Sequence, residues 1–311
     1  MTSPLPPLAH GAVVTVGSFD GIHLGHRAVI DEVLGRARRS GRPSLLVTFE
    51  PHPTRVLHPE RAQPLLTPGI ERREALAETG LDYVAVLRFD PAMAARTAES
   101  FVTEILRGSC QMAELVVGHD HGFGRGRSGD AAALSALGAR LGFEVTVVAP
   151  VAEAEGGVVS SSAIRDRIRR GDLAEAARAL GRPYRVSGPV RRGAQRGRTL
   201  GVPTLNLAPP PEKLLPPDGV YAVRVEWGGG TALGMLNQGP RPTVGDPTRW
   251  LEAHLFEFDG DLYDRIVRIE WVAKLREIQR FGSLDELKAQ LAQDRAAART
   301  ALGVGERPLT V

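Results

Sequence analysis

The sequence predicts an α/β protein in two parts: a doubly wound parallel sheet, then a small antiparallel β-barrel with a C-terminal helix. Its 311 residues suffice for two domains, each able to bury its own core. Up to about residue 180, short β-branched runs alternate with amphipathic helical patterns, which is typical of a parallel sheet. From residue 183 the apolar runs stay short, Gly and Pro become frequent, and the alternation with helices stops. We therefore predict domains over residues 1–182 and 183–311.

The first predicted element is a buried strand over 13–16, where four β-branched residues stand in a row. Apolar residues at 29, 30, 33, 34 and 37 recur at helical spacing and predict a helix over 27–37. Between the two elements, Gly17 and Gly21 let the backbone turn tightly.

His23 and His26 lie where this strand gives way to the helix. Helix N-termini bind phosphate through their unpaired N–H groups and the helix dipole. Two imidazoles beside a glycine backbone that permits close approach therefore suit a triphosphate. The alternative is that one histidine caps the helix and the other is solvated.

The rest of the first half alternates in the same way. We predict strands over 44–49, 83–87, 115–117 and 144–148, and helices over 71–79, 98–107, 131–141 and 173–180, with a further helix opening at the serines 160–162. Segment 50–53 is expected to stay extended because its two prolines disfavour a helix. Ligands of such sheets bind beyond the carboxyl ends of the strands. His23, His26, His52 and Asp120 all follow predicted strands, so we expect them to converge there.

The second half begins after a helix stop at 181–184. Strands are predicted near 220–226, 232–236, 250–258 and 265–273, which suggests a small antiparallel barrel. A helix is predicted over 283–300, with Ser283 as its cap and Glu286 at the third helical position.

Composition excludes several classes of protein. With 39 basic and 36 acidic residues and a net charge of +3, we expect no nucleic-acid surface. No apolar run is long enough to span a bilayer and the first residues do not form a secretory signal, so no membrane is expected. The single Cys110 excludes an intrachain disulfide and favours a cytoplasmic location. No lysine precedes Lys213, so any ATP is bound without a P-loop.

The stretch 17–26 reads Gly-Ser-Phe-Asp-Gly-Ile-His-Leu-Gly-His. It resembles the phosphate-binding signature of the nucleotidyltransferases, in the form found in the adenylyltransferase half of bacterial bifunctional riboflavin kinase/FAD synthetases. The resemblance implies a Rossmann-like domain and catalytic roles for His23 and His26. It also implies that the ATP phosphates are bound by four residues of the same stretch: Gly17, Phe19, Asp20 and Gly25.

Two later segments resemble further parts of these synthetases. Residues 117–124 are similar to a loop of the form Val-Gly-x-Asp/Asn-Phe-x-Phe-Gly, which implies that Asp120 binds the nucleotide. We expect flavin contacts at His52, His121 and Phe123, and the family usually has an aromatic residue where His121 stands. Residues 160–165 resemble Ser-Ser-Thr-x-x-Arg, the alternative being that these serines only cap a helix. This resemblance implies phosphate binding by Ser160, Ser161, Ser162 and Arg165.

The second half resembles the riboflavin kinase domain over nearly its whole length. The motifs are Gly-x-Pro-Thr-x-Asn at 201–206, Gly-Val-Tyr at 219–221, Asn-x-Gly-x-Arg-Pro-Thr at 237–243 and Glu-x-His-Leu-Phe-x-Phe-Asp at 252–259. Phosphorylation of a hydroxyl group needs a base, and Glu252 is the candidate. Thr204 and Asn206 alternate onto one face and offer oxygens to Mg²⁺ or Mn²⁺. ATP contacts are expected at Gly193, Gly197, Arg198, Pro203 and Asn237.

These resemblances imply a two-step enzyme, which uses ATP to convert riboflavin to FMN and then FMN to FAD and pyrophosphate. A fragment starting near Arg182 is expected to keep the kinase activity if it folds alone. Two alternatives stay open at this point: a single activity, with a decayed flavin site at His121 and Gly122, and a flavin carrier or sensor without turnover. The sequence leaves open whether the chain forms a homo-oligomer.

Overall fold

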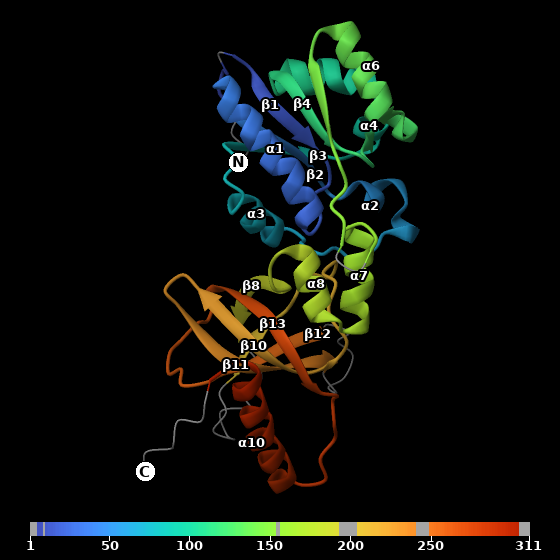
Figure 1. Ribbon diagram of the computed structural model, residues 1–311. Coiled ribbons are helices and arrows are strands. Elements are labelled where there is room, and N and C mark those ends of the chain that lie inside the picture. Colours follow the sequence, from blue (N-terminus) through green and yellow to red (C-terminus); the bar gives the residue numbers. More distant parts are fainter. Residues whose placement is uncertain (1–4, 9, 154–155, 193–203, 241–248, 305–311) are drawn as a thin grey trace. The chain divides into compact units, whose positions relative to one another are not determined.

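The computed structural model describes residues 5–8, 10–153, 156–192, 204–240 and 249–304 (Figure 1). The chain divides into two compact units, Met1–Leu65 with Arg72–Ser161, and Leu66–Glu71 with Ser162–Val311. The second unit therefore includes a short segment from the first half of the sequence, and helices predicted in the first domain fall into it. The domain boundary at 182/183 stays a prediction.

A five-stranded parallel sheet forms the first unit, with strand order β3-β2-β1-β4-β7. The strands are β1 (Ala12–Val16), β2 (Ser44–Glu50), β3 (Tyr83–Arg88), β4 (Met112–Gly118) and β7 (Glu144–Val148). β1 is central and every one of its residues is buried, as its β-branched run predicted.

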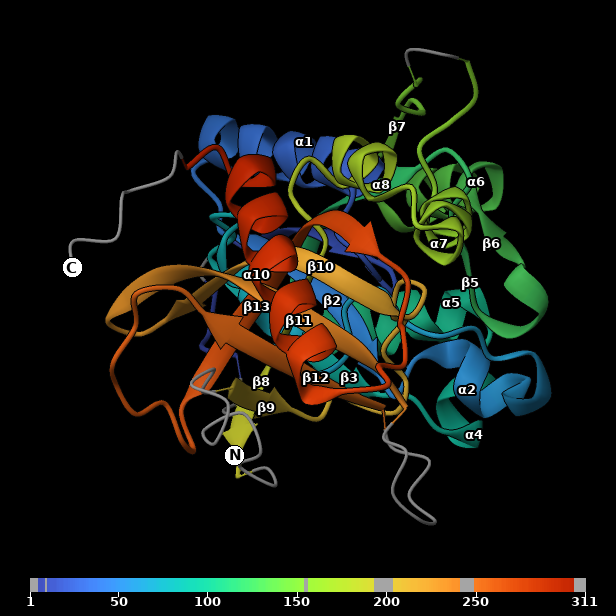
Figure 2. The ribbon, with the colours of Figure 1, turned by 90° about the horizontal axis from the view of Figure 1, so that it is seen from below.

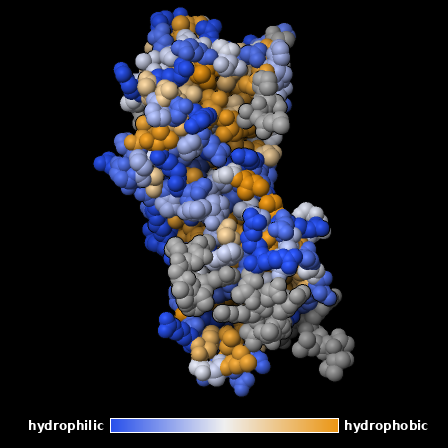
Figure 3. Space-filling model, turned by 180° about the vertical axis from the view of Figure 1, so that it is seen from behind, coloured by the Kyte–Doolittle hydropathy of each residue, from blue (hydrophilic) through white to orange (hydrophobic). Residues whose placement is uncertain are grey.

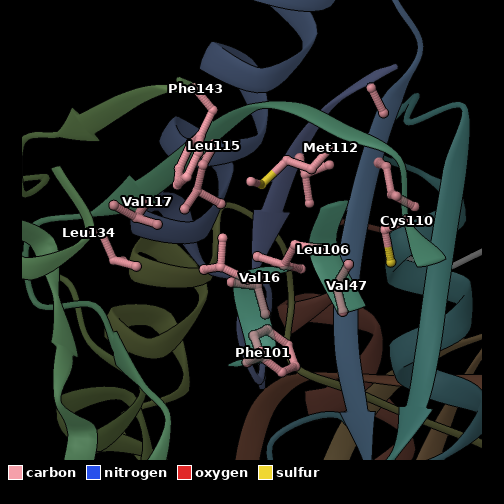
Figure 4. Packing of buried hydrophobic residues seen from close by; sticks show 14 of the residues in the cluster. Val16, Val47, Phe101, Leu106, Cys110, Met112, Leu115, Val117, Leu134 and Phe143 are labelled. Atoms are coloured by element: carbon pink, nitrogen blue, oxygen red, sulfur yellow. The ribbon is translucent and has the colours of Figure 1, made fainter. Parts of the chain in front are cut away.

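Helices cover both faces of this sheet, which makes it doubly wound. The helices are α1 (Leu24–Ser40), α2 (Pro53–Leu57), η1 (Pro59–Arg61), α3 (Ile70–Ala77), α4 (Pro91–Ala94), α5 (Ala98–Ser100), the π-helix η2 (Phe101–Ser109), η3 (Arg125–Arg127) and α6 (Ala131–Leu141). α1 packs on one face through Val29, Val33 and Ala37. η2 and α6 pack on the other, where Phe101 and Leu134 meet the sheet (Figure 4).

The prediction that segment 50–53 stays extended is wrong at its end. α2 begins at Pro53. Proline is tolerated at this position because the N–H that it lacks would have no partner inside the first turn of a helix. His52 is the N-cap of this helix.

The second unit is a closed antiparallel barrel with strand order β10-β11-β12-β9-β8-β13. Its strands are β8 (Arg185–Arg191), β9 (Thr204–Leu207), β10 (Gly219–Trp227), β11 (Gly230–Pro240), β12 (Arg249–Leu255) and β13 (Ile266–Arg276), and its helices are α7 (Ser161–Arg170), α8 (Leu173–Leu180) and α10 (Leu284–Ala301). The third predicted barrel strand thus ends at Leu255, before residue 258. Tyr221 and Trp271 are the largest buried side chains here.

α10 packs on β10, β11 and β13 (Figure 2). It starts as predicted, since Ser283 accepts the backbone N–H of Glu286 at 3.2 Å. Arg276 of β13 forms a double hydrogen bond with the buried Asp294 of α10, at 2.8 and 2.7 Å. A charge-assisted bidentate pair of this kind fixes the helix in register on the barrel.

The surface mixes hydrophilic and hydrophobic residues on the face seen in Figure 3. None of the helices in the described part of the chain has both the length and the apolar character needed to cross a bilayer.

Candidate active sites

The turn between β1 and α1 has an unusual backbone. Within it Gly21 has a φ of 91°, and Phe19 and Ile22 have φ values of 48° and 43°. Such values cost a non-glycine residue about 1–3 kcal/mol, so the turn persists only where its surroundings hold it. Phe19 and Ile22 are buried in the core beside β2 and α3. A Cβ on Gly17 would lie 3.1 Å from the Phe19 ring, so this position also favours glycine.

His23 and His26 form a stacked pair at the start of α1. Their ring centroids are 3.7 Å apart, with 18° between the planes. His23 is the N-cap: its Nδ1 accepts the backbone N–H of His26 at 3.3 Å, so the neutral ring carries its proton on Nε2. A Cβ on Gly25 would lie 3.1 Å from the His23 ring. The sequence left open that one histidine caps the helix and the other is solvated. The first part holds, because His23 caps α1, whereas the ring of His26 stacks on that of His23.

Three side chains hold carbonyl groups of this turn. Thr48 Oγ1 and Arg72 Nη1 both donate to the carbonyl oxygen of Ser18, at 3.2 and 3.3 Å. Ser161 Oγ donates to the carbonyl oxygen of Asp20 at 2.9 Å. The structure thus brings together Asp20 and Ser161, two of the residues expected to bind phosphate, although the Asp20 carboxylate itself is buried.

Arg72, which was not among the residues predicted from the sequence, also belongs to this turn's surroundings. Its side chain is 7% exposed, and Nη2 lies 3.7 Å from Glu50 Oε2. Burial lowers the pKa of Arg72 from its usual value, while the charges of Glu50 and Asp20 raise it. The neighbouring Arg73 lies at the same distance from Glu50 but is exposed. Since both arginines stand in one predicted helix, the sequence carries no signal that separates them.

The serine segment opens α7, as predicted. Ser160 directly precedes the helix, Ser161 is its first residue and Ser162 its second. Arg165 lies one turn further and is buried. Phosphate binding by these residues stays a prediction.

The glycine-rich segment after β4 contains a short hairpin, in which β5 (Gly122–Phe123) pairs with β6 (Gly129–Asp130). Gly124 lies so close to Ala98 that a Cβ would be 2.7 Å from its backbone nitrogen. The ring of His121 meets that of Phe123 edge-on at 5.3 Å, and Phe123 packs against the sheet core. Phe123 is therefore held by the protein itself, and its expected flavin contact stays a prediction.

Asp120 and His52 follow the two strands that flank β1, as predicted. Asp120 is exposed and its carboxylate lies 3.9 Å from His119 Nδ1. His52 Nδ1 accepts the backbone N–H of Thr54 at 3.3 Å, which orients its ring at the start of α2. Their contacts with nucleotide and flavin stay predictions.

Several predicted kinase residues share one face of the barrel. Glu252 of β12 pairs with Asn206 of β9 on one side and with Asn237 of β11 on the other. His254, two residues along, pairs with Thr204. Residues that pair directly in antiparallel strands point to the same face, with Cβ atoms about 4.5–5.5 Å apart. The alternate residues of these strands are mostly apolar and buried inside the barrel, so this polar face is the outer one.

Thr204 and Asn206 offer a hydroxyl and an amide oxygen on this face, and Asn206 is 4% exposed. Mg²⁺ prefers oxygen ligands and keeps several waters, so this donor set fits Mg²⁺ or Mn²⁺. Over the described ranges, no cluster of three His, Cys, Asp or Glu side chains suits a metal ion. The remaining predicted ATP contacts fall outside the described residues: Gly193, Gly197, Arg198 and Pro203.

A second feature that sequence analysis missed is a buried ion pair in the barrel unit. Lys213 Nζ lies 2.5 Å from Glu71 Oε2, and both side chains are 0% exposed. The ammonium also donates to the carbonyl oxygens of Leu66 and Arg185, at 2.7 and 2.6 Å. It lies 4.2 Å from the ring centre of Tyr184. Lys213 thus donates to two groups of the segment Leu66–Glu71 and to one carbonyl oxygen of β8, and so joins this segment to the barrel.

Two models of known protein families match successive parts of the chain. A family model described as FAD synthetase matches residues 5–163, and one described as riboflavin kinase matches residues 180–302.

Curated relatives match nearly the whole chain. The chain is similar to a protein of Escherichia coli K12 named bifunctional riboflavin kinase/FMN adenylyltransferase. The two are 41% identical over 94% of each chain. A protein of the same name in Pseudomonas fluorescens is 40% identical over 95% of this chain and 94% of its own. In Bacillus subtilis the corresponding values are 31%, 92% and 91%.

The fold also occurs among solved structures. A crystal structure described as a macrolide-efflux protein from Streptococcus pneumoniae matches with a TM-score of 0.81 and 32% identity, over 93% of this chain and 94% of that one. That description applies to the pneumococcal protein, whereas both family models and the curated relatives name flavin enzymes.

Proposed function

This chain belongs to the family of bifunctional riboflavin kinases/FMN adenylyltransferases, and we propose that it carries out the two reactions at two separate sites. The protein phosphorylates riboflavin with ATP to give FMN, and transfers AMP from ATP to FMN to give FAD and pyrophosphate. We assign AMP transfer to residues 1–182 and phosphorylation to residues 183–311. A chain with a single cysteine suits the reducing cytoplasm, where we propose that both reactions run.

The stacked pair His23 and His26 carries the assignment of AMP transfer. Because Nδ1 of His23 accepts a backbone N–H, its Nε2–H is the donor offered to phosphate oxygens. The N-terminus of α1 adds the helix dipole, which favours an anion. The phosphate of FMN is already an anion and needs no base. Catalysis then consists of orienting the reactants and stabilising charge at the α-phosphate.

The row Asn206, Glu252 and Asn237 supports the assignment of phosphorylation. The ribityl hydroxyl of riboflavin must lose a proton, and Glu252 is the carboxylate on this face that accepts it. Thr204 and Asn206 would hold Mg²⁺, and Asn237 would contact ATP. When bound, Mg²⁺ supplies charge neutralisation at the transferred phosphoryl group.

Damage at one site should leave the other reaction intact. His26→Ala should still convert riboflavin to FMN and stop there, whereas Glu252→Gln should fail on riboflavin but still turn supplied FMN into FAD. Loss of a general base costs about 10²–10⁴ in rate, so chromatography of the flavins after incubation with Mg²⁺–ATP suffices. His58→Ala and Glu257→Gln, at exposed positions, serve as matched controls.

Four outcomes would contradict the proposal. If His26→Ala abolished FMN formation, or Glu252→Gln abolished FAD formation from FMN, in a chain that circular dichroism shows to be folded, a shared site would replace the two-site assignment. A wild-type chain that made FMN but no FAD would be the single-activity alternative. One that bound flavin without forming either product would be a carrier or sensor.

A further inference from the structure

We propose that Arg72 is a positioning residue for AMP transfer, which holds the Ser18 carbonyl group and thereby orients the backbone N–H groups of the turn before α1. This inference rests on the proposed function, because it takes the turn as the place where the triphosphate binds.

The peptide bond between Ser18 and Phe19 links the carbonyl group that Arg72 contacts to the N–H group that follows it. A trans peptide is planar, so its carbonyl oxygen and the following N–H point in opposite directions. Thr48 and Arg72 both donate to the Ser18 oxygen, at 3.2 and 3.3 Å, and both are buried. Two donors account for both lone pairs of that oxygen. Together they fix the direction of the Phe19 N–H, which points away from Arg72.

The turn needs such a hold because its backbone is strained. Phe19 and Ile22 have positive φ, a conformation that L-residues leave unless contacts maintain it. If the Ser18 carbonyl were released, the peptide plane between Ser18 and Phe19 would be able to rotate toward negative φ at Phe19. A rotated carbonyl oxygen would then face an incoming phosphate and repel it.

An arginine suits this position better than a neutral donor. The carboxylates of Glu50 and Asp20 lie near the turn, and their charge acts on the guanidinium. Without a buried cation, these carboxylates would disfavour a triphosphate close by. Arg72 therefore has two effects on the turn: it donates a hydrogen bond to one carbonyl group, and its single positive charge weakens the combined field of two carboxylates.

Arg73 provides a matched control for the second effect. Its guanidinium lies 3.7 Å from the same Glu50 oxygen as that of Arg72, but it is 69% exposed and stands outside the turn. Arg72→Gln removes the bond to Ser18 and one cation. Arg73→Gln removes one cation beside Glu50 and leaves that bond in place. Arg72→Lys keeps the charge and shortens the reach.

The experiment measures steady-state FAD formation from FMN in the full-length chain, with FMN formation from riboflavin as an internal reference. A hydrogen bond from a charged group corresponds to about a tenfold to hundredfold change in rate. We expect Arg72→Gln to lower kcat/KM for ATP in AMP transfer by that factor and to weaken pyrophosphate binding in calorimetry. KM for FMN and the kinase reaction should stay within about twofold. Arg72→Lys should recover part of the loss, and Arg73→Gln should match the wild type.

Other results would overturn the inference. Equal losses in Arg72→Gln and Arg73→Gln would make charge near Glu50, and not the Ser18 carbonyl, responsible. A parallel rise of KM for ATP and FMN, or a fall of both activities, would indicate general loosening of the fold.

Thr48→Val removes the other donor to the same oxygen and should lower AMP transfer in the same sense, by a smaller factor. His26→Ala separates the two proposals: if it blocks FAD formation while Arg72→Gln does not, the proposed function stands and the role of Arg72 falls.

Discussion

The buried ion pair between Lys213 and Glu71 allows a sharp test of how the barrel unit is held together. Replacing Glu71 by leucine removes the carboxylate that lies 2.5 Å from the Lys213 ammonium and leaves that ammonium buried. Replacing Lys213 by methionine leaves the carboxylate buried instead. Each single change therefore removes one charge of the pair and leaves the other charge buried.

The size of the effect follows from this burial. Removing one partner of a buried pair costs about 3–5 kcal/mol, whereas replacing both by apolar residues is often neutral. For a unit of this size, each kcal/mol lowers the unfolding temperature by about 2–4 °C. We expect Glu71→Leu and Lys213→Met each to lower it by about 6–20 °C, and the double variant to be more stable than either single one.

Tryptophan fluorescence is the appropriate assay, because all three tryptophans lie in the barrel half of the chain. Trp271 stacks on Tyr184 at 5.6 Å, and Tyr184 in turn lies beneath the Lys213 ammonium. Urea and thermal unfolding followed by this signal report on the barrel and not on the parallel sheet. Glu277→Gln, which breaks an exposed pair in the same unit, should change stability by less than about 1 kcal/mol.

Additivity would refute the reasoning: a double variant whose loss equals the sum of the two single losses shows no coupling between the charges.

The pair also changes the expectation for an isolated kinase fragment. A chain starting near Arg182 lacks Glu71, so Lys213 would lose this carboxylate partner. We now expect such a fragment to be unstable, and to gain stability from Lys213→Met.

Three further predictions concern the sites and the thiol. Gly25→Ala should lower FAD formation at least about tenfold, because its Cβ would lie 3.1 Å from the His23 ring. Gly35→Ala in the same helix is the control, since its Cβ would meet only the end of a flexible side chain. This control should raise the free energy of unfolding in urea by about 0.5–1 kcal/mol and leave activity unchanged. Both reactions should stop in EDTA and recover with Mg²⁺ or Mn²⁺, and Asn206→Ala should raise the Mg²⁺ concentration needed for half-maximal kinase activity; full kinase turnover in EDTA would remove the metal assignment. Burial raises the pKa of Cys110 to about 11, so at pH 8.5 the folded protein should resist iodoacetamide while the unfolded chain reacts within minutes, as mass spectrometry would detect; the rate in the folded protein should rise only as the pH approaches 11.

The sequence by itself determined the alternating strands and main helices of the first unit, four of the six barrel strands and the terminal helix, and it supplied the candidate residues of both sites. The β-branched run before Gly17 predicted a buried strand, and the apolar spacing after His26 predicted the helix that follows it. Alternation along two short barrel segments predicted that Thr204 and Asn206 share a face, as do Glu252 and His254. Such patterns are local: spacing of two or 3.6 residues decides which side chains point the same way.

The tertiary structure decided which distant residues meet. Glu71 and Lys213 are 142 positions apart, and Ser18 and Arg72 are 54 apart. These separations are far larger than the repeat of a helix or strand, so no periodic pattern in the sequence predicts either contact. A charged residue in a predicted helix is expected to face water, and only the packed structure distinguishes the buried Arg72 from an exposed neighbour. The sequence therefore specified the groups to which we assign the chemistry, and the fold specified the groups that we propose hold them, because positioning depends on contacts between segments far apart in the chain.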